Sequence, residues 1–266
     1  ENEMTKPFNW KLFFIVWIAA VFGIIAVIPY TLTLQGTVLQ ELDLPIPLPL
    51  LLVIQIGQNA VMFAALTALG LFFANRVGLG LPILEAKLAG ESVADKIRAI
   101  LPLSIIIGAV AAALIIGLDV FVFQPALLNE LGSAAEALAS GSVKPPAWQG
   151  FLASFYGGIS EEVLLRLFVM SLFVWLGSFI SKTTEGKPTS AVFWVANILA
   201  AVLFGLGHLP ATASFLPLTP LVIARAIVLN GVAGVAFGWL YWKRGLESAI
   251  VAHFTADIVL HVLFAL

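Results

Sequence analysis

Hydrophobic residues occupy long unbroken stretches of the chain, and short polar segments separate them. Stretches of about 20 apolar residues are long enough to cross the hydrocarbon core of a bilayer as helices. Strands of a membrane barrel would be shorter and would alternate apolar and polar positions, and these stretches do not alternate. The pattern predicts seven spans, near residues 12–34, 49–74, 99–123, 150–180, 189–208, 220–241 and 246–265.

Two connections between the predicted spans are long. Residues 75–98 have an amphipathic pattern, which indicates a segment that lies on the membrane surface. Residues 124–148 include the stretch NELGSAAEALASG. That stretch predicts a short surface helix, ended by Gly141 and followed by Pro145 and Pro146.

The composition supports a protein of the bilayer. Of the 266 residues, 61% are hydrophobic and 11% are charged, and the mean hydropathy is +1.06. A soluble domain of this length would need more polar surface, so we predict an all-α, polytopic transmembrane bundle of about seven to eight helices in the cell membrane, with membrane lipid as a partner. We expect one integral membrane domain, with transmembrane helices and surface segments in residues 1–148 and a further helical core in residues 149–266.

Composition also excludes several function classes. The chain has no cysteine, so it has neither a disulfide framework nor a thiolate nucleophile. A net charge of −2 gives no reason to expect nucleic acid as a partner.

Basic residues fall in alternate connections between the predicted spans. Cytoplasmic loops of membrane proteins carry an excess of Lys and Arg, so this alternation predicts an amino terminus inside and a carboxyl terminus outside. The opposite connections hold almost no basic residue beyond Lys144. The residues on the predicted inner side are Lys6, Lys11, Arg76, Lys87, Lys96, Arg98, Lys182, Lys187, Lys243 and Arg244.

The fourth predicted span contains three charged residues, Glu161, Glu162 and Arg166. A charge at the middle of a span costs about 2.5–3.5 kcal/mol on insertion scales, so such residues usually face the bundle interior and act there. Glu162 and Arg166 are four residues apart, so they share a helix face and can pair. Glu161 points about 100° away, which leaves it free to face a cavity as the working carboxylate. The alternative, an ion pair that only fixes packing, leaves Glu161 without a partner.

Three histidines lie in apolar surroundings late in the chain. His208 ends the fifth predicted span, and His253, Asp257 and His261 form an i, i+4, i+8 stripe on the seventh. A carboxylate such as Glu161 can draw a proton from water, and an imidazole can hold that water or protonate the leaving amine. A second imidazole with a polar neighbour can donate to the developing oxyanion. Together these residues predict peptide hydrolysis by activated water, without a covalent acyl-enzyme.

Three motifs in the second half of the chain carry a family resemblance. They are Glu161-Glu162-x-x-x-Arg166, Phe204-x-x-x-His208 and His253-x-x-x-Asp257, and Asn230 lies in the stretch that leads to the last of them. In this order they resemble the motifs of the CPBP family of intramembrane proteases, which includes the type II CAAX prenyl endopeptidases and bacteriocin-processing or immunity proteins. The resemblance covers roughly residues 150–260.

The resemblance implies a glutamate-dependent intramembrane endopeptidase. In that reading Glu161 is the general base, His208 helps to hold the water, and His253 with Asp257 forms the oxyanion side. Asp257 departs from the commoner Asn of the motif, so an orienting or metal-binding role stays open for it. The implied supporting residues are Glu162, Arg166, Phe204 and Asn230.

Cofactor, substrate and access remain open on the sequence. We expect no cofactor, because the chain has no HExxH helix; the ligands for a zinc ion, if one bound, would be Glu161, His208 and His253. The substrate is expected to be membrane-associated or lipidated: a prenylated CAAX-type tail, a leader peptide or a membrane protein. The predicted orientation places Glu161 and His208 in the outer half of the bilayer, whereas a prenylated protein would approach from the cytosol. Asp119 and Arg225 are expected to snorkel at the interface.

Two other functions remain as alternatives. A non-enzymatic immunity or scaffold protein of the same family would keep the polar cluster for packing. A proton-coupled transporter would use buried Glu, His and Arg as a relay. Transporters of that kind contain an internal repeat of broken helices, and the sequence has no such repeat.

Overall fold

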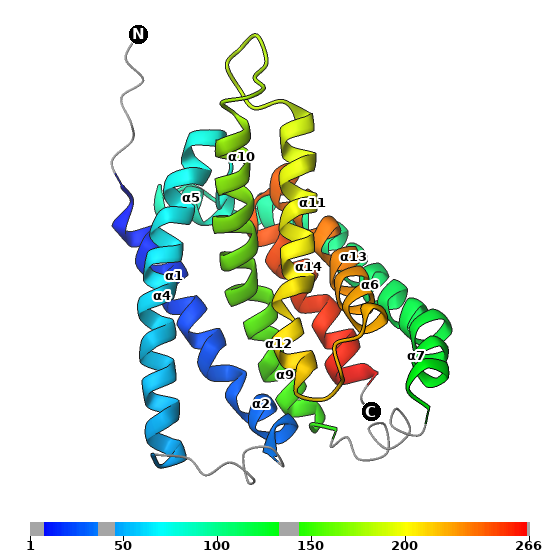
Figure 1. The fold of residues 1–266 in the computed structure, drawn as a ribbon. Coiled ribbons are helices and arrows are strands. Elements are labelled where there is room, and N and C mark those ends of the chain that lie inside the picture. Colours follow the sequence, from blue (N-terminus) through cyan, green and yellow to red (C-terminus); the bar gives the residue numbers. More distant parts are fainter. Residues whose placement is uncertain (1–7, 37–45, 133–143, 265–266) are drawn as a thin grey trace.

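The computed structural model describes residues 8–36, 46–132 and 144–264, and in these ranges the chain is almost entirely helical (Figure 1). The one β-type pairing among the described residues is an isolated bridge between Lys182 and Pro188. The predicted all-α bundle is therefore confirmed.

The first two predicted spans form helices close to their expected bounds. The first consists of α1 (Trp10–Ala26) and α2 (Ile28–Leu34), and the second is α4 (Leu48–Val77). Asn9 caps α1 by accepting a hydrogen bond from the backbone N–H of Leu12 at 3.1 Å, which satisfies one of the free donors of the first turn.

The third predicted span is longer than the sequence indicated. A single helical run comprises α6 (Ala94–Leu118), η1 (Asp119–Phe123) and α7 (Gln124–Leu131), so it starts before residue 99 and continues past residue 123. The polar residues at its start, Asp95, Lys96 and Arg98, are exposed. The preceding connection contains a short helix, α5 (Pro82–Leu88). Most of NELGSAAEALASG, with Gly141, lies outside the described residues.

The fourth predicted span is one continuous helical run in the interior of the bundle. It comprises α9 (Ala147–Phe155), η2 (Tyr156–Glu161), η3 (Val163–Met170) and α10 (Ser171–Gly177). The η segments have the wider turn of a π-helix. Such turns are rare in proteins as a whole, and those that occur are often found at functional sites. Helices α1 and α4 pack on this run from one direction and α11 and α14 from another, so it is enclosed along much of its length.

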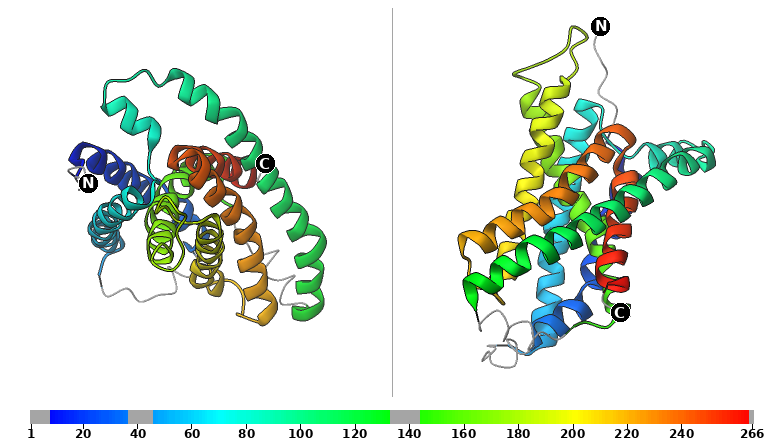
Figure 2. Two further views of the ribbon diagram at one scale, coloured as in Figure 1. Left: turned by 90° about the horizontal axis from the view of Figure 1, so that it is seen from above. Right: turned by 90° about the vertical axis from the view of Figure 1, so that its right-hand side faces the viewer.

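The last three predicted spans lie side by side. α13 packs along α11 and also against α14, and α14 packs against α6 (Figure 2). The helices of this part are α11 (Ser190–Gly207), α12 (Leu209–Ala213), α13 (Pro220–Arg244), α14 (Leu246–Asp257) and η4 (Ile258–Leu263).

Six helical runs are long and apolar enough to cross a membrane. They correspond to six of the seven predicted spans. The run over residues 147–177 is not among the six, because three charged residues lower its hydropathy. The chain is a multi-pass membrane protein whose most polar helix is surrounded by apolar ones.

Candidate active site

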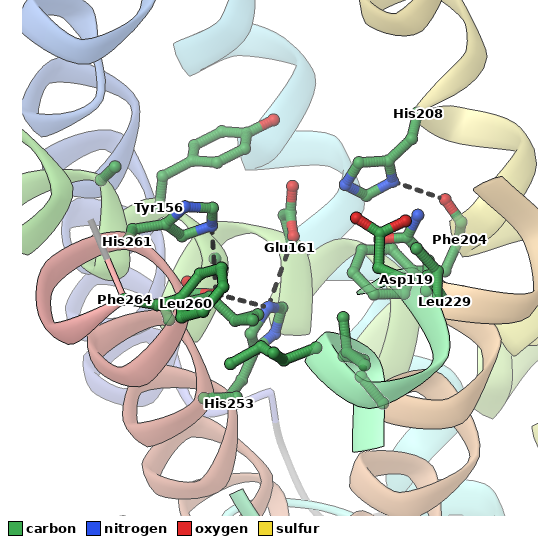
Figure 3. A pocket seen from close by; sticks show the side chains of 18 of the residues that line it. Asp119, Tyr156, Glu161, Phe204, His208, Leu229, His253, Leu260, His261 and Phe264 are labelled. Carbon is green, nitrogen blue, oxygen red and sulfur yellow. Dashed lines mark hydrogen bonds and ion pairs between the residues drawn. The ribbon is translucent and has the colours of Figure 1, made fainter. Parts of the chain in front are cut away.

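A cavity of about 480 Å³ lies where the ends of several helices meet. Its walls come from the end of α1, α2, the junction of α6 and η1, η2, the end of α11, the first half of α13, and α14 with η4. The four residues predicted to be catalytic all line it, as do two of the predicted supporting residues (Figure 3). These six are Glu161, His208, His253, Asp257, Phe204 and Asn230.

Glu162 and His253 are a buried, hydrogen-bonded pair within the site. Glu162 is 0% exposed, and its Oε1 accepts a hydrogen bond from His253 Nδ1 at 2.8 Å. Its Oε2 lies 3.3 Å from Arg166 Nε, so the predicted i, i+4 ion pair is present. Arg166 is also 0% exposed, and its guanidinium lies 5.4 Å from the centroid of the Phe204 ring. Besides this pairing with Arg166, Glu162 also orients an imidazole from α14.

Glu161 faces the cavity, as its position on the helix predicts. Its side chain is 18% exposed, and its Oε2 lies 3.7 Å from His253 Nε2. The two adjacent carboxylates therefore contact the two nitrogens of one imidazole, Glu162 from inside the protein and Glu161 from the cavity side.

His208 is the capping residue at the carboxyl end of α11. Its Nδ1 donates a hydrogen bond of 2.8 Å to the backbone carbonyl of Phe204, and its ring packs edge-on against the Phe204 ring at 4.8 Å. A carbonyl only accepts, so this bond fixes the tautomer and leaves Nε2 as the free ring nitrogen. Figure 3 shows the side chains of His208 and Glu161 turned toward the same cavity.

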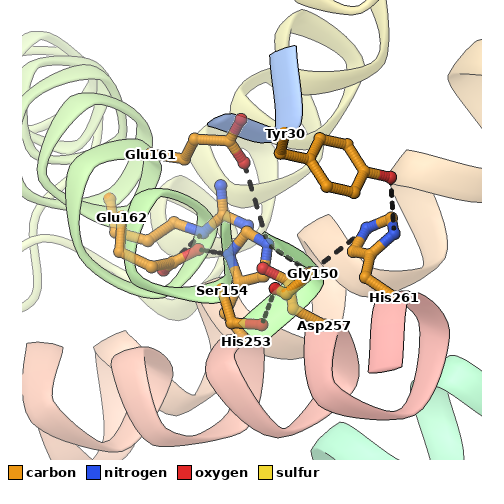
Figure 4. Close-up of polar contacts among 9 residues, drawn as sticks. Tyr30, Gly150, Ser154, Glu161, Glu162, His253, Asp257 and His261 are labelled. Atoms are coloured by element: carbon orange, nitrogen blue, oxygen red, sulfur yellow. Dashed lines mark hydrogen bonds and ion pairs between the residues drawn. The ribbon is translucent and has the colours of Figure 1, made fainter. Parts of the chain in front are cut away.

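Asp257 lies between two imidazoles. Its Oδ1 is 3.7 Å from His253 Nε2 and 4.0 Å from His261 Nε2. His261 Nδ1 is in turn 3.2 Å from the hydroxyl of Tyr30, which comes from α2 (Figure 4). The i, i+4, i+8 stripe on the last helix therefore forms one line of polar contacts along the wall of the cavity.

Close approach of α14 to the polar helix depends on a glycine. A Cβ on Gly157 would collide with the carboxylate of Asp257 and would lie 3.1 Å from His253 Nε2. At Gly158 a Cβ would lie 3.0 Å from the Cβ of Phe254. The absence of side chains at this glycine pair therefore lets α14 approach the polar helix closely.

Asp119 and Arg225 do not snorkel separately, as the sequence suggested. They form a bidentate ion pair between η1 and α13, with 2.6 Å from Nε to Oδ1 and 2.8 Å from Nη2 to Oδ2. Both line the cavity. Packing of η1 against α13 is the reason, because it places the two side chains within reach of each other. Asn230, also on the wall, donates to the carbonyl of Ala226 at 2.8 Å.

Sequence reasoning missed two tyrosines on the cavity wall. Tyr30 contacts His261 from α2, and Tyr156 lines the cavity from η2. Tyr156 stands five residues before Glu161, inside the polar span, and that position was a usable signal. Tyr30 had no such signal, because its partner lies 231 residues away.

Within the described ranges, no group of three or more His, Cys, Asp or Glu side chains has an arrangement that would hold a metal ion. His253 Nδ1 and His208 Nδ1 are both engaged by protein acceptors, so each ring offers a single nitrogen to the cavity. The expected zinc-free mechanism stays a prediction.

Comparison with protein-family models gives one match, over residues 142–259. The matching family is described as type II CAAX prenyl endopeptidase Rce1-like. Residues 142–259 match this family, which is less than half of the chain. The Rce1-like region contains the whole polar helix and both histidines that flank Glu161, and this agrees with the CPBP resemblance of the motifs. Comparisons with curated proteins and with solved structures give no match.

At family level the Rce1-like match supports a CAAX-type intramembrane protease. The matched range starts a few residues before the division expected between residues 148 and 149, and that division stays a prediction. Tyr30 and Asp119 lie outside the Rce1-like region, so the cavity is completed by helices that the family match does not include.

Proposed function

We propose that the protein is an intramembrane endopeptidase in which Glu161 activates a water molecule for attack on a peptide bond. The observation that carries the proposal is the convergence of Glu161, His208 and His253 on one cavity from three separate helices. Insertion of so many ionisable groups into a membrane bundle is costly, and such groups usually mark a functional site. The family match supplies the reaction class.

In the first step Glu161 takes a proton from water, and the water oxygen forms a bond to the carbonyl carbon of the substrate. His208 holds the water through Nε2, the ring nitrogen that its bond to Phe204 leaves free. The tetrahedral intermediate carries a negative charge on the former carbonyl oxygen. Hydrogen-bond donors that already point at this oxygen stabilise the negative charge without having to reorganise.

In the second step the C–N bond breaks, and the proton on Glu161 passes to the leaving amine. His253 Nε2 is the ring atom that faces both Glu161 and Asp257, so it is the atom that this imidazole presents to the reacting groups. Asp257 orients His253, because its carboxylate lies between the two imidazoles of the last helix. That orienting role fits Asp at this position better than donation to the oxyanion, which a carboxylate performs only when protonated.

The substrate is a membrane-associated or lipidated peptide, and a prenylated CAAX-type tail is the substrate class that the family description names. The cavity suits such a chain because apolar residues form much of its wall beside the polar groups. They include Val27, Ile115, Ile116, Leu229 and Leu260.

The direct test is Glu161→Gln. The amide keeps the size of the side chain but cannot accept a proton, so cleavage of prenylated and unprenylated CAAX peptides should fall by a factor of at least about 100, within the range that removal of a general base produces. Peptide products are measured by mass spectrometry with the purified protein in detergent. The matched control is Glu130→Gln, which alters an exposed carboxylate in α7 and should cleave as the native protein does.

Full turnover by Glu161→Gln would rule out the glutamate mechanism. If Glu161→Gln and His253→Gln both keep the biological function while neither they nor the native protein cleaves a peptide, the non-enzymatic alternative is correct instead.

Metal dependence is tested by dialysis of the native protein against a strong chelator. We expect peptide cleavage to continue at an unchanged rate, because the proposed steps use only side chains and water. Loss of cleavage that added zinc restores would contradict this and would assign a metal to Glu161, His208 and His253.

A further inference from the structure

The cavity lies at one end of the bundle, and the charged residues show which end it is. Every spanning helix except α4 contributes residues to the described lining, and these residues lie toward one end of each helix. The cavity-side ends are marked by Tyr30 after α1, Asp119 after α6, His208 after α11, Arg225 in the second turn of α13 and His261 after α14.

A second cavity, of about 440 Å³, lies at the opposite end of α6 and α13. It is lined by the connection that follows α4, by α5, by the start of α6, by the end of α13 and by the turn that leads into α14. Lys96, Lys243 and Arg244 are among its lining residues, and all three are exposed. The two cavities therefore mark opposite ends of the same helices, and one of these ends is basic.

Almost all the exposed positive charge lies at that basic end. Among the described residues, the basic residues at the cavity end are Lys144 and Arg225, and Arg225 is paired with Asp119. The opposite end carries Lys11, Arg76, Lys87, Lys96, Arg98, Lys182, Lys187, Lys243 and Arg244. An excess of Lys and Arg in short loops holds those loops in the cytoplasm, so the basic end is cytoplasmic.

The chemistry of the first cavity restricts what enters it. Its described lining includes three carboxylates, from Asp119, Glu161 and Asp257, one guanidinium, from Arg225, and the imidazoles of His208, His253 and His261. That guanidinium already makes two short hydrogen bonds to Asp119. The described lining therefore offers no unpaired guanidinium or ammonium group to an acidic segment, whereas the carboxylates of Glu161 and Asp257 disfavour negative charge close to them.

We infer that the catalytic cavity opens on the non-cytoplasmic side of the membrane and receives an apolar, non-acidic segment of an exported or membrane-inserted chain. The inferred substrate rests on the proposed endopeptidase function. The inferred side of the membrane rests on the charge distribution alone. A prenylated tail that stays in the cytosol does not reach a cavity in this orientation.

The side of the membrane is tested without any assay of cleavage. The chain has no cysteine, so single cysteines report their positions unambiguously. Ser214→Cys places a thiol in the exposed connection between α12 and α13 at the cavity end, and Thr184→Cys places one in the exposed connection between α10 and α11 at the basic end. Each variant is expressed as the full chain and treated with a membrane-impermeant maleimide before and after permeabilisation of the cells.

We expect Ser214→Cys to be labelled in intact cells and Thr184→Cys to be labelled only after permeabilisation. The reverse result, or labelling of both variants in intact cells, overturns the inferred orientation and leaves the proposed peptidase function untouched.

Access of substrate is tested with vesicles that contain the native protein. Two water-soluble fluorogenic peptides of equal length are added outside, one with an uncharged apolar segment and one with two Glu residues in that segment. We expect cleavage of the uncharged peptide to be at least tenfold faster with right-side-out than with inside-out vesicles, and at least tenfold faster than that of the acidic peptide.

Faster cleavage with inside-out vesicles overturns the inferred access side while it supports the peptidase. Equal cleavage of the two peptides overturns the inferred substrate class. If neither peptide nor a CAAX peptide is cleaved even in detergent, the proposed function fails, and the cysteine labelling still decides the side to which the cavity opens.

Discussion

Two adjacent glutamates have different environments because one helical residue step turns the side chain by about 100°. Glu162 faces the protein interior, is 0% exposed, and accepts a hydrogen bond of 2.8 Å from His253 Nδ1. Glu161 is turned toward the cavity, where its carboxylate is 3.7 Å from the other nitrogen of the same ring. The ring is therefore held from one side and remains available for proton exchange on the other.

The absence of a side chain at Gly157 leaves room for this imidazole, and Gly157→Ala tests whether that room is needed. The added Cβ would collide with the carboxylate of Asp257 and crowd His253 Nε2, so both groups must move. Such overpacking costs about 1–3 kcal/mol, and we expect kcat for peptide cleavage to fall by about 10- to 100-fold.

The matched control is Gly158→Ala, one residue further along. Its Cβ would lie 3.0 Å from the Cβ of Phe254, so it disturbs packing against the same helix but meets no polar group of the site. We expect this variant to lose thermal stability with kcat close to native. Equal losses of kcat in the two variants would show that the spacing of the helices, rather than the carboxylate of Asp257, is what matters.

At the scale of elements, the site depends on close packing between helices that are distant in the sequence. Helices α11 and α13 approach at small residues, because a Cβ on Gly234 would lie 2.8 Å from the Cβ of Ala201. At Gly238 a Cβ would collide with the side-chain oxygen of Asn197, whose amide donates to the carbonyl of Val235 at 2.9 Å. Small residues let membrane helices pack closely, since burial of apolar surface drives no association inside lipid.

A pair of alanine substitutions on α13 tests this packing. Gly238→Ala should lower the thermal unfolding temperature in detergent by several degrees, because the new Cβ has no room beside Asn197. Gly231→Ala is the control on the same helix. A Cβ there meets nothing within 4 Å, so the variant should be as stable as the native protein or more stable by up to about 1 kcal/mol. A native unfolding temperature for Gly238→Ala would contradict the packing argument.

At the scale of the whole molecule, a charged cluster is enclosed in an apolar bundle. Glu162 and Arg166 are both 0% exposed and lie 3.3 Å apart, and the guanidinium has no other carboxylate within 4 Å among the described residues. Removal of one partner from a buried pair leaves an uncompensated charge and costs about 3–5 kcal/mol. A typical protein has only about 5–15 kcal/mol of stability in total.

We therefore expect Glu162→Leu to abolish or greatly reduce the yield of monodisperse protein. Addition of Arg166→Met in the same chain should restore most of the yield, because apolar replacement of both members of a buried pair is often neutral. The double variant should still fail to cleave peptide, since His253 Nδ1 then has no acceptor. Size-exclusion chromatography and the peptide assay measure the two effects separately. A stable single Glu162→Leu variant would show that Arg166 does not depend on this partner.

The sequence by itself determined the helical membrane fold, the approximate spans and the contacts within a single helix. Apolar runs of spanning length leave the backbone no alternative to helix, since every backbone polar group must be paired inside lipid. Contacts such as Glu162 with Arg166 and His253 with Asp257 follow from the spacing of four residues, because helix geometry places such pairs on one face.

Only the tertiary structure decided which helices meet. Three hydrogen-bonded pairs are far apart in the sequence. Glu162 and His253 are separated by 91 residues, Asp119 and Arg225 by 106, and Tyr30 and His261 by 231. No periodicity in the sequence relates such positions, because each contact depends on how close two packed helices approach, and small residues such as Gly157 set that distance. The cavity that these contacts enclose is for the same reason a property of the packed bundle and not of any one helix.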